Sequence, residues 1–181
     1  MKLNYKTYNK KRNIYYTITS IIGMSLCVWI IELYQKTFVE LYILFVIVLG
    51  VGLIATLIDF KYYKKTYSLK GFSSIFFAFL TNLSIWGFTT CALFMTSNYY
   101  FEKSKSRFKT YEIIDRYSII GSKRNRSEST PVFQILHKVK IKDIYFGNDF
   151  YKDMNSFKNI ELEIKQGFWK FDILINKKLK K

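Results

Sequence analysis

Proline, histidine and cysteine are nearly absent from this chain of 181 residues, and each shortage excludes a class of protein. Two cysteines are too few for a disulfide framework. The single histidine, His137, has no second histidine with which to share a metal, which argues against zinc sites and most histidine-dependent catalysis. Because half of the residues are hydrophobic, the chain is not intrinsically disordered.

Acidic residues are also scarce, since 13 Asp and Glu stand against 29 Lys and Arg, for a formal net charge of +16. The cations are segregated along the chain. Residues 1–13 carry five and residues 61–70 carry four, whereas residues 14–60 contain only Lys36 and residues 71–100 contain none. Apolar blocks separated by basic ones are typical of a membrane protein.

Three apolar blocks, at residues 14–33, 38–58 and 72–98, are each long enough to cross a bilayer. A helix rises about 1.5 Å per residue, so about 20 residues span a hydrocarbon core of about 30 Å. The alternative, buried helices of a soluble bundle, is not favoured because the blocks lack a charged face. We therefore predict a multi-pass protein of the cell membrane, with a membrane domain at residues 1–100 and a β-rich soluble module at residues 101–181.

The cations in the short loops predict the orientation of the chain. The link at residues 34–37 has one cation, while the N-terminal arm has five and the 61–70 loop has four. By the positive-inside rule the N-terminus and the 61–70 loop are cytoplasmic, and three spans then place the module outside the cytoplasmic membrane. Basic residues at positions 103–109 favour the opposite orientation, which therefore stays open.

Small and polar residues inside the spans predict helix packing. Gly50, Gly52 and Ala55 allow close approach on the second span. The third span has a polar streak made of Thr81, Asn82, Ser84, Thr89 and Thr90. Because we expect no charged residue in the middle of a span, a substrate path is not predicted, and a pore would require oligomers.

The tail has the pattern of β-strands. Apolar and charged residues alternate with period two at residues 160–165, and Gln166-Gly167 then predicts a tight hairpin with a strand at residues 168–175. In that register three apolar pairs share one face: Ile164 with Trp169, Leu162 with Phe171, and Ile160 with Ile173.

Further strands are expected upstream of this hairpin. Residues 133–141 alternate as a strand that ends in a turn or bulge near Lys142-Asp143, and residues 110–120 hold a strand pair. Asn148-Asp149 would cap a short helix. The predicted fold is membrane α plus β: three transmembrane helices followed by a small antiparallel β-sheet or partly open β-barrel module with one short helix.

Four motifs of the tail resemble motifs of a known protein family. They are Ile114-Asp115-Arg116-Tyr117-Ser118, the basic loop into Pro131-Val132-Phe133, Phe150-Tyr151-Lys152-Asp153-Met154, and Gly167-Phe168 through Phe171-Asp172-Ile173-Leu174. Together they resemble a family of uncharacterised small multi-pass membrane proteins of Bacteroidota-type bacteria with a C-terminal β-rich module. Lys170 stands where that family has a second glycine. The resemblance supports the layout and, because the family has no assigned activity, it transfers no functional residue.

The residues that most often carry chemistry have structural explanations here. His137 is in phase with the apolar positions of its strand, which indicates an inward-facing structural histidine. Asp143, Asp149 and Asp153 lack the spacing of a calcium loop and are interpreted as turn and cap residues. No nucleotide-binding glycine motif is present in the sequence. We therefore expect no catalytic residue, no metal site, no cofactor and no enzymatic function.

The loop at residues 121–131 holds the candidate anion-binding residues Lys123, Arg124 and Arg126, although a solvated hairpin loop explains them as well. Two functions stay open. In the first, a non-enzymatic membrane protein anchors a basic module that binds a protein partner or a second copy of the chain, in an envelope accessory or immunity-type role. In the second, the module senses a small phosphorylated ligand through these cations, and the spans oligomerise to permeabilise the bilayer. The lipid bilayer is a partner in both, and charge alone is weak support for nucleic acid.

Overall fold

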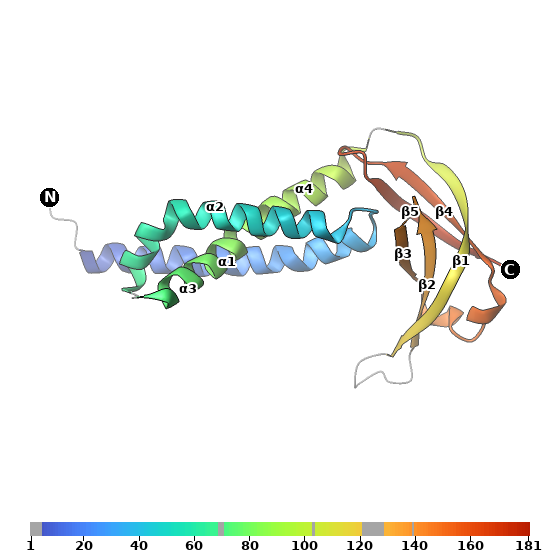
Figure 1. The fold of residues 1–181 in the computed structure, drawn as a ribbon, viewed down its shortest axis with the longest axis horizontal. Helices are drawn as coiled ribbons and strands as arrows, with labels where there is room; N and C mark the ends of the chain where they lie inside the picture. Colours follow the sequence, from blue (N-terminus) through green and yellow to red (C-terminus); the bar gives the residue numbers. More distant parts are fainter. Residues whose placement is uncertain (1–4, 69–70, 103, 121–128, 139) are drawn as a thin grey trace. The chain divides into compact units, whose positions relative to one another are not determined.

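A computed structural model describes residues 5–68, 71–102, 104–120, 129–138 and 140–181. The chain divides into two compact units. The helical unit comprises residues 1–34 and 39–100, and the sheet unit comprises residues 35–38 and 101–181. The expected succession of three long apolar helices and a small antiparallel sheet is confirmed (Figure 1).

Within the part of the chain that the structure describes, the helical unit has three helices long and apolar enough to cross a membrane. The first is α1 (Tyr5–Gln35) and the second is α2 (Leu41–Tyr67); the third is formed by α3 (Phe72–Asn82), the π-helical segment η1 (Leu83–Gly87) and α4 (Phe88–Tyr100). Helices α1 and α2 extend beyond the apolar blocks at residues 14–33 and 38–58, because the flanking Lys, Arg and Tyr are good enough helix formers to continue them.

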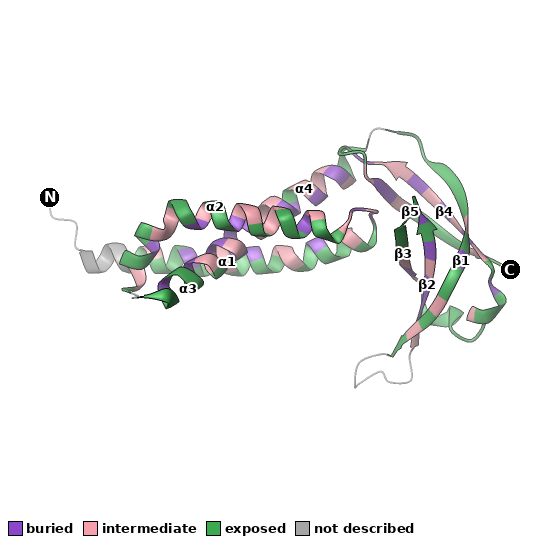
Figure 2. Ribbon diagram, viewed as in Figure 1, coloured by how far each residue is buried: buried purple, intermediate pink, exposed green. Residues whose placement is uncertain are grey.

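Large apolar side chains remain exposed along all three helices. Figure 2 shows exposed positions, in green, along each of these helices. Leu57 is 81% exposed, Phe72 is 80% exposed and Val28 is 70% exposed. A helix of a soluble bundle would turn such residues toward a core, whereas lipid chains cover them in a membrane. The burial pattern therefore agrees with the hydropathy in favouring three membrane spans.

The three helices come close together at η1. A Cβ built on Gly23 of α1 would lie 1.8 Å from the carbonyl oxygen of Ser84, and one on Gly52 of α2 would lie 3.1 Å from Cα of Leu83. The prediction of close approach is thus confirmed for Gly52. It is wrong for Gly50, because a Cβ there would meet nothing within 4 Å. The small-residue pattern of one helix does not show which of its faces meets a neighbour.

The polar streak of the third span is used mostly within its own helix. The Thr81 hydroxyl donates to Tyr63 Oη at 3.2 Å, which joins α3 to α2. In contrast, Asn82 Nδ2 donates to the Ala78 carbonyl one turn back, and Thr89 donates to a carbonyl of its own helix. Side chains of this kind satisfy themselves locally when no partner faces them.

In the described residues of the sheet unit, five antiparallel strands form a sheet in the order β3-β2-β1-β4-β5. They are β1 (Arg107–Ile120), β2 (Ser129–His137), β3 (Lys140–Tyr145), β4 (Asn159–Gln166) and β5 (Asp172–Lys180). The sheet does not close, but it curls. Lys177 of β5 donates to the carbonyl of Tyr145 at the end of β3, so the two edge strands approach each other.

The concave side of the curled sheet holds an apolar core. Its buried members are Ile113, Phe133, Ile135, Ile144, Phe146, Phe157, Ile160, Leu162 and Ile164. The alternation expected at residues 160–165 is confirmed, since Ile160, Leu162 and Ile164, at every second position of the strand, are fully buried. Period two therefore identified the core face of β4 correctly.

The register of the β4–β5 hairpin differs from the predicted one. Ile164 pairs with Leu174 instead of Trp169, because the turn comprises the five residues 167–171 instead of two. Lys170 takes the left-handed conformation of that turn, with φ at +67°, a position that sequence patterns assign to glycine. The same shift excludes the predicted facing of Leu162 with Phe171 and of Ile160 with Ile173.

Two other local predictions are wrong, and a third, the short helix, is confirmed without its expected cap. Residues 107–120 form one continuous strand with a bulge instead of a strand pair, so the apolar positions change phase without a turn. The turn between β2 and β3 lies at Lys138, with φ at +48°, and Asp143 lies within β3. The expected short helix consists of two 3₁₀ turns, η2 (Asn148–Phe150) and η3 (Met154–Ser156), and no side chain caps the first.

The link between α1 and α2 is hydrogen-bonded to the sheet. Thr37 forms an antiparallel bridge with Ile173 of β5. The Phe38 amide donates to the Asp172 carbonyl at 2.8 Å, and the Leu174 amide donates to the Lys36 carbonyl at 2.8 Å. This short stretch therefore extends the sheet beyond β5, although it lies more than 130 residues earlier in the chain.

Candidate functional sites

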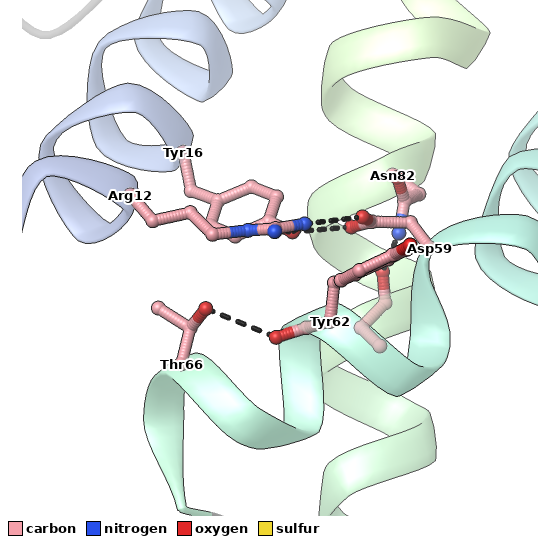
Figure 3. Close-up of polar contacts among 7 residues, drawn as sticks. Arg12, Tyr16, Asp59, Tyr62, Thr66 and Asn82 are labelled. Atoms are coloured by element: carbon pink, nitrogen blue, oxygen red, sulfur yellow. Dashed lines mark hydrogen bonds and ion pairs between the residues drawn. The ribbon is translucent and has the colours of Figure 1, made fainter. Parts of the chain in front are cut away.

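Among the described residues of the helical unit, a cluster of ionised side chains lies around Asp59 of α2 (Figure 3). Arg12 Nη2 lies 3.0 Å from Asp59 Oδ1, and the Tyr16 hydroxyl donates to Asp59 Oδ2 at 2.6 Å. Arg12 also donates to Tyr16 Oη at 3.0 Å, which closes a ring of three side chains. The guanidinium lies over the ring of Tyr62, 4.6 Å from its centroid. These contacts join the beginning of α1 to the end of α2.

The sequence analysis missed this cluster because Arg12 and Asp59 fall just outside the apolar blocks at residues 14–33 and 38–58. A signal was nevertheless present. Consecutive spans joined by a short link run antiparallel, so residues shortly before the first and shortly after the second come to the same level of the bilayer. An acidic and a basic residue at those two levels therefore predict an ion pair.

Two cavities border the Arg12 side chain. The larger, of about 800 Å³, lies among α1, α2 and η1, and its apolar lining includes Tyr15, Ile54, Ile58 and Trp86. The smaller, of about 170 Å³, is lined by Arg12, Lys61, Tyr62, Lys65 and Thr66. One cavity is thus apolar and the other basic, and Arg12 contributes to both.

In the sheet unit, a second acid has several basic neighbours. Asp172 is the first residue of β5, and its side chain is fully buried. Lys138 Nζ lies 2.7 Å from Oδ2, His137 Nε2 lies 3.1 Å from Oδ2, and Arg107 Nη2 lies 3.3 Å from Oδ1. The carboxylate thereby receives donors from β1, β2 and the turn after β2.

His137 lies inside the sheet unit, 6% exposed, as its phase in the sequence predicted. Its Nδ1 is 2.7 Å from the Tyr111 hydroxyl, and Phe38 stacks on its ring with the centroids 4.1 Å apart. Burial lowers the pKa of His137, and the nearby Asp172 only partly opposes this effect. A neutral ring satisfies both contacts, because Nε2–H donates to Asp172 and Nδ1 accepts from Tyr111.

The carboxyl of Asp172 is ionised at neutral pH. Burial alone would raise its pKa, but the hydrogen bond and charge of Lys138, with His137 and Arg107, lower the pKa below its usual value. Burial, followed by the charge of Asp172, raises the pKa of Tyr111. Both nitrogens of His137 are engaged and its ring is buried, so this Tyr-His-Asp arrangement has no nitrogen available to act as a base on a substrate. Its role is to hold the link against β5.

Cations also lie on the concave side of the sheet, beside the apolar core. Arg107 pairs with Ile164, Lys142 pairs with Ile135, and Lys177 pairs with Leu162; directly opposite residues share a face. Burial lowers the pKa of Lys142 to about 8 and also lowers the pKa of Lys177. Long aliphatic stems explain how these residues border an apolar core while their amines reach its rim.

The remaining residues that the sequence singled out are located as follows. Lys123, Arg124 and Arg126 lie outside the described residues. Asp143 accepts hydrogen bonds from the Tyr117 hydroxyl at 3.1 Å and from Gln134 Nε2 at 2.9 Å, which gives it a structural role in the sheet. Among the residues that the structure describes, no group of three His, Cys, Asp or Glu could hold a metal ion.

Comparison with known proteins gives no relative. No family model, no curated protein and no solved structure matches this chain. The resemblance of the tail to small Bacteroidota-type membrane proteins therefore stays a prediction, and the function has to be argued from the two units themselves.

Proposed function

We propose that this chain is a non-enzymatic multi-pass membrane protein whose sheet unit binds a protein partner. The observation that supports this best is a set of exposed apolar side chains on the convex side of the sheet. Ile141 is 61% exposed, Ile114 is 54% exposed and Leu136 is 52% exposed. Leu136 and Ile141 lie directly opposite each other on β2 and β3, and Ile114 occupies the bulge of β1, the next strand. The concave side already has its own core, so these residues are available to a partner.

The surroundings of this apolar set favour a protein over a lipid surface. The next row on the convex side has one residue on each of the same three strands. These residues are Asp115, Gln134 and Asp143. Two acids in that row would repel anionic headgroups, whereas they fit the polar rim of a protein interface. Tyr117, partly exposed and bonded to Asp143, adds the residue type that is enriched in such interfaces.

The orientation is part of this proposal. The link at residues 35–38 is paired with β5, so the link and the sheet unit share one side of the membrane. The link region contributes a single cation, Lys36, whereas the opposite ends of α1 and α2 carry the basic clusters at residues 1–13 and 61–70. The positive-inside rule then favours a cytoplasmic N-terminus and an exported sheet unit.

Labelling of introduced cysteines tests the orientation. The exposed positions Asp149 and Lys64 are each replaced by cysteine, and intact cells are treated with a membrane-impermeant maleimide. We expect labelling of D149C and none of K64C until the cells are opened. The reverse pattern would place the sheet unit in the cytoplasm and favour a cytoplasmic phosphorylated ligand instead.

Site-specific photo-crosslinking tests the partner surface. Benzoylphenylalanine is placed at Leu136 and at Ile141, and at Tyr151 as an exposed aromatic control in the same unit. We expect both surface positions, but not the control, to give the same protein adduct, and the substitution Ile141→Asp to remove the Leu136 adduct. Adducts only with lipid would contradict the proposal, and a product of twice the chain mass would identify a second copy instead of a distinct partner.

A further inference from the structure

We propose that the helical unit binds an anionic phospholipid, with its phosphate at the basic cavity and an acyl chain in the apolar cavity. The two cavities share the side chain of Arg12. A basic site and an apolar site joined in this way match the two chemical parts of one phospholipid molecule. The inference concerns the helical unit alone and does not depend on the proposed partner of the sheet unit.

The apolar cavity is open to lipid and long enough for the part of an acyl chain nearest the headgroup. Its lining on α2 extends from Val51 to Asp59, a separation of eight positions, or about 12 Å at about 1.5 Å per residue. Ile54 is 60% exposed and Ile58 is 73% exposed, so the cavity opens on the side of the helices that lipid covers. Trp86 of η1 forms another part of its lining. An apolar groove at this place in a span is filled by hydrocarbon instead of water.

The basic cavity has an excess of positive charge. Asp59 matches the charge of Arg12, while Lys61 and Lys65 add two further cations to a lining that contains no acid. The Tyr62 ring lies beneath the guanidinium and, with Asp59 and Tyr16, fixes its position (Figure 3). Guanidinium and ammonium groups held together in this way bind phosphate oxygens through charge-assisted hydrogen bonds.

The position of the basic cavity favours a lipid over a soluble phosphate. Residues 61–66 continue α2 beyond its apolar stretch, which is the level at which headgroups lie. A soluble anion would gain only the cations, whereas a phospholipid gains the cations and the apolar cavity together. A zwitterionic headgroup would bring its own cation toward Lys61 and Lys65, so the fit is to an anionic headgroup such as that of phosphatidylglycerol.

Fluorescence of Trp86 tests this site. The full chain carrying Trp29→Phe and Trp169→Phe is placed in nanodiscs of phosphatidylcholine that contain a small fraction of phosphatidylglycerol with brominated acyl chains, a contact quencher. We expect stronger quenching of Trp86 than with the same fraction of brominated phosphatidylcholine. The double substitution Lys61→Gln and Lys65→Gln should weaken this preference about tenfold, because cations near the bilayer surface each contribute appreciably to binding anionic lipid.

A charge-matched variant distinguishes a site from general attraction. Lys10→Gln and Lys64→Gln remove the same charge from exposed positions that line neither cavity, and should leave the preference unchanged. Equal quenching by both brominated lipids, equal losses in the two double variants, or reversal of quenching by millimolar inorganic phosphate would each overturn the proposal. The thermal unfolding midpoint of each variant, measured in the same nanodiscs, checks that the variant is still folded.

Discussion

The two units each contain an acid held by basic side chains, and they use it differently. In the helical unit Asp59 balances one cation, Arg12, and both side chains are 21% exposed. In the sheet unit Asp172 is fully buried among more cations than it can balance. Lipid is as apolar as the helix surfaces, so helix association needs specific polar and close-packed contacts. The sheet already has an apolar core, and its acid instead fastens a distant segment of the chain to β5.

The largest effect is expected from Asp172→Asn. The substitution removes the negative charge between Arg107 and Lys138 and leaves the buried His137 Nε2–H without an ionised acceptor, at a cost of about 2–3 kcal/mol. Hydrogen exchange, followed by mass spectrometry on the full chain in detergent, should become faster in β5 and in residues 36–38. Peptides of the helical unit should not change.

Asp149→Asn is the control for this variant, because Asp149 is an exposed acid of the same unit. Unchanged protection of β5 in Asp172→Asn would show that the apolar core alone holds the link, and the contrast between the two acids would be lost.

A somewhat smaller effect is expected from Gly23→Ala, which tests close packing in the helical unit. The added Cβ would lie 1.8 Å from a backbone oxygen of η1, so α1 must move away, at a cost of about 1–3 kcal/mol. Gly50→Ala adds the same methyl group where nothing lies within 4 Å. We expect a lower thermal unfolding midpoint for the first variant only; equal midpoints would contradict the close contact between α1 and η1.

The Arg12–Asp59 pair should show the next effect. Arg12→Gln or Asp59→Asn alone leaves one charge without its counterpart, whereas the double variant leaves none, so the double variant should be more stable than the sum of the single effects predicts. Each single change should cost about 1–2 kcal/mol, less than for a fully buried pair, because both side chains are partly exposed. Additive losses in denaturant unfolding would show that the two residues act independently.

Sequence reasoning succeeded where the signal was local and repeated. Twenty apolar residues indicate a span, and the alternation at residues 160–165 identified the buried Ile160, Leu162 and Ile164. It failed where a single residue breaks a preference, as Lys170 does by adopting a left-handed turn conformation, which moved the whole hairpin register. A single residue of this kind decides how many residues a turn contains. The average conformational preference of lysine does not predict it.

Sequence reasoning also failed where contacts join distant positions. The bridge between Thr37 and Ile173 and the pair of Arg12 and Asp59 depend on which helix ends and strand edges meet. That information follows from the completed fold instead of from any stretch of sequence. Both candidate sites of the helical and sheet units belong to this class, which is why neither was predicted.

The smallest effect concerns acidification, and it should separate the two units. The pKa of His137 is lowered in the folded chain by burial, so the unfolded chain binds more protons as the pH falls. The stability that the neutral ring contributes is complete above the ordinary pKa of about 6.5 and is lost as the pH falls through the lowered value. Asp172 stays ionised in this range, because its own pKa is lowered.

Thermal unfolding followed by Trp169 fluorescence, in a Trp29→Phe and Trp86→Phe background, should therefore occur at lower temperature at pH 5.5 than at pH 7.5. In His137→Gln, which retains hydrogen-bonding groups beside Tyr111 and Asp172, the difference should shrink. An unchanged difference would mean that another group, such as Lys142, whose pKa is lowered to about 8, carries the pH dependence and that the histidine ring does not.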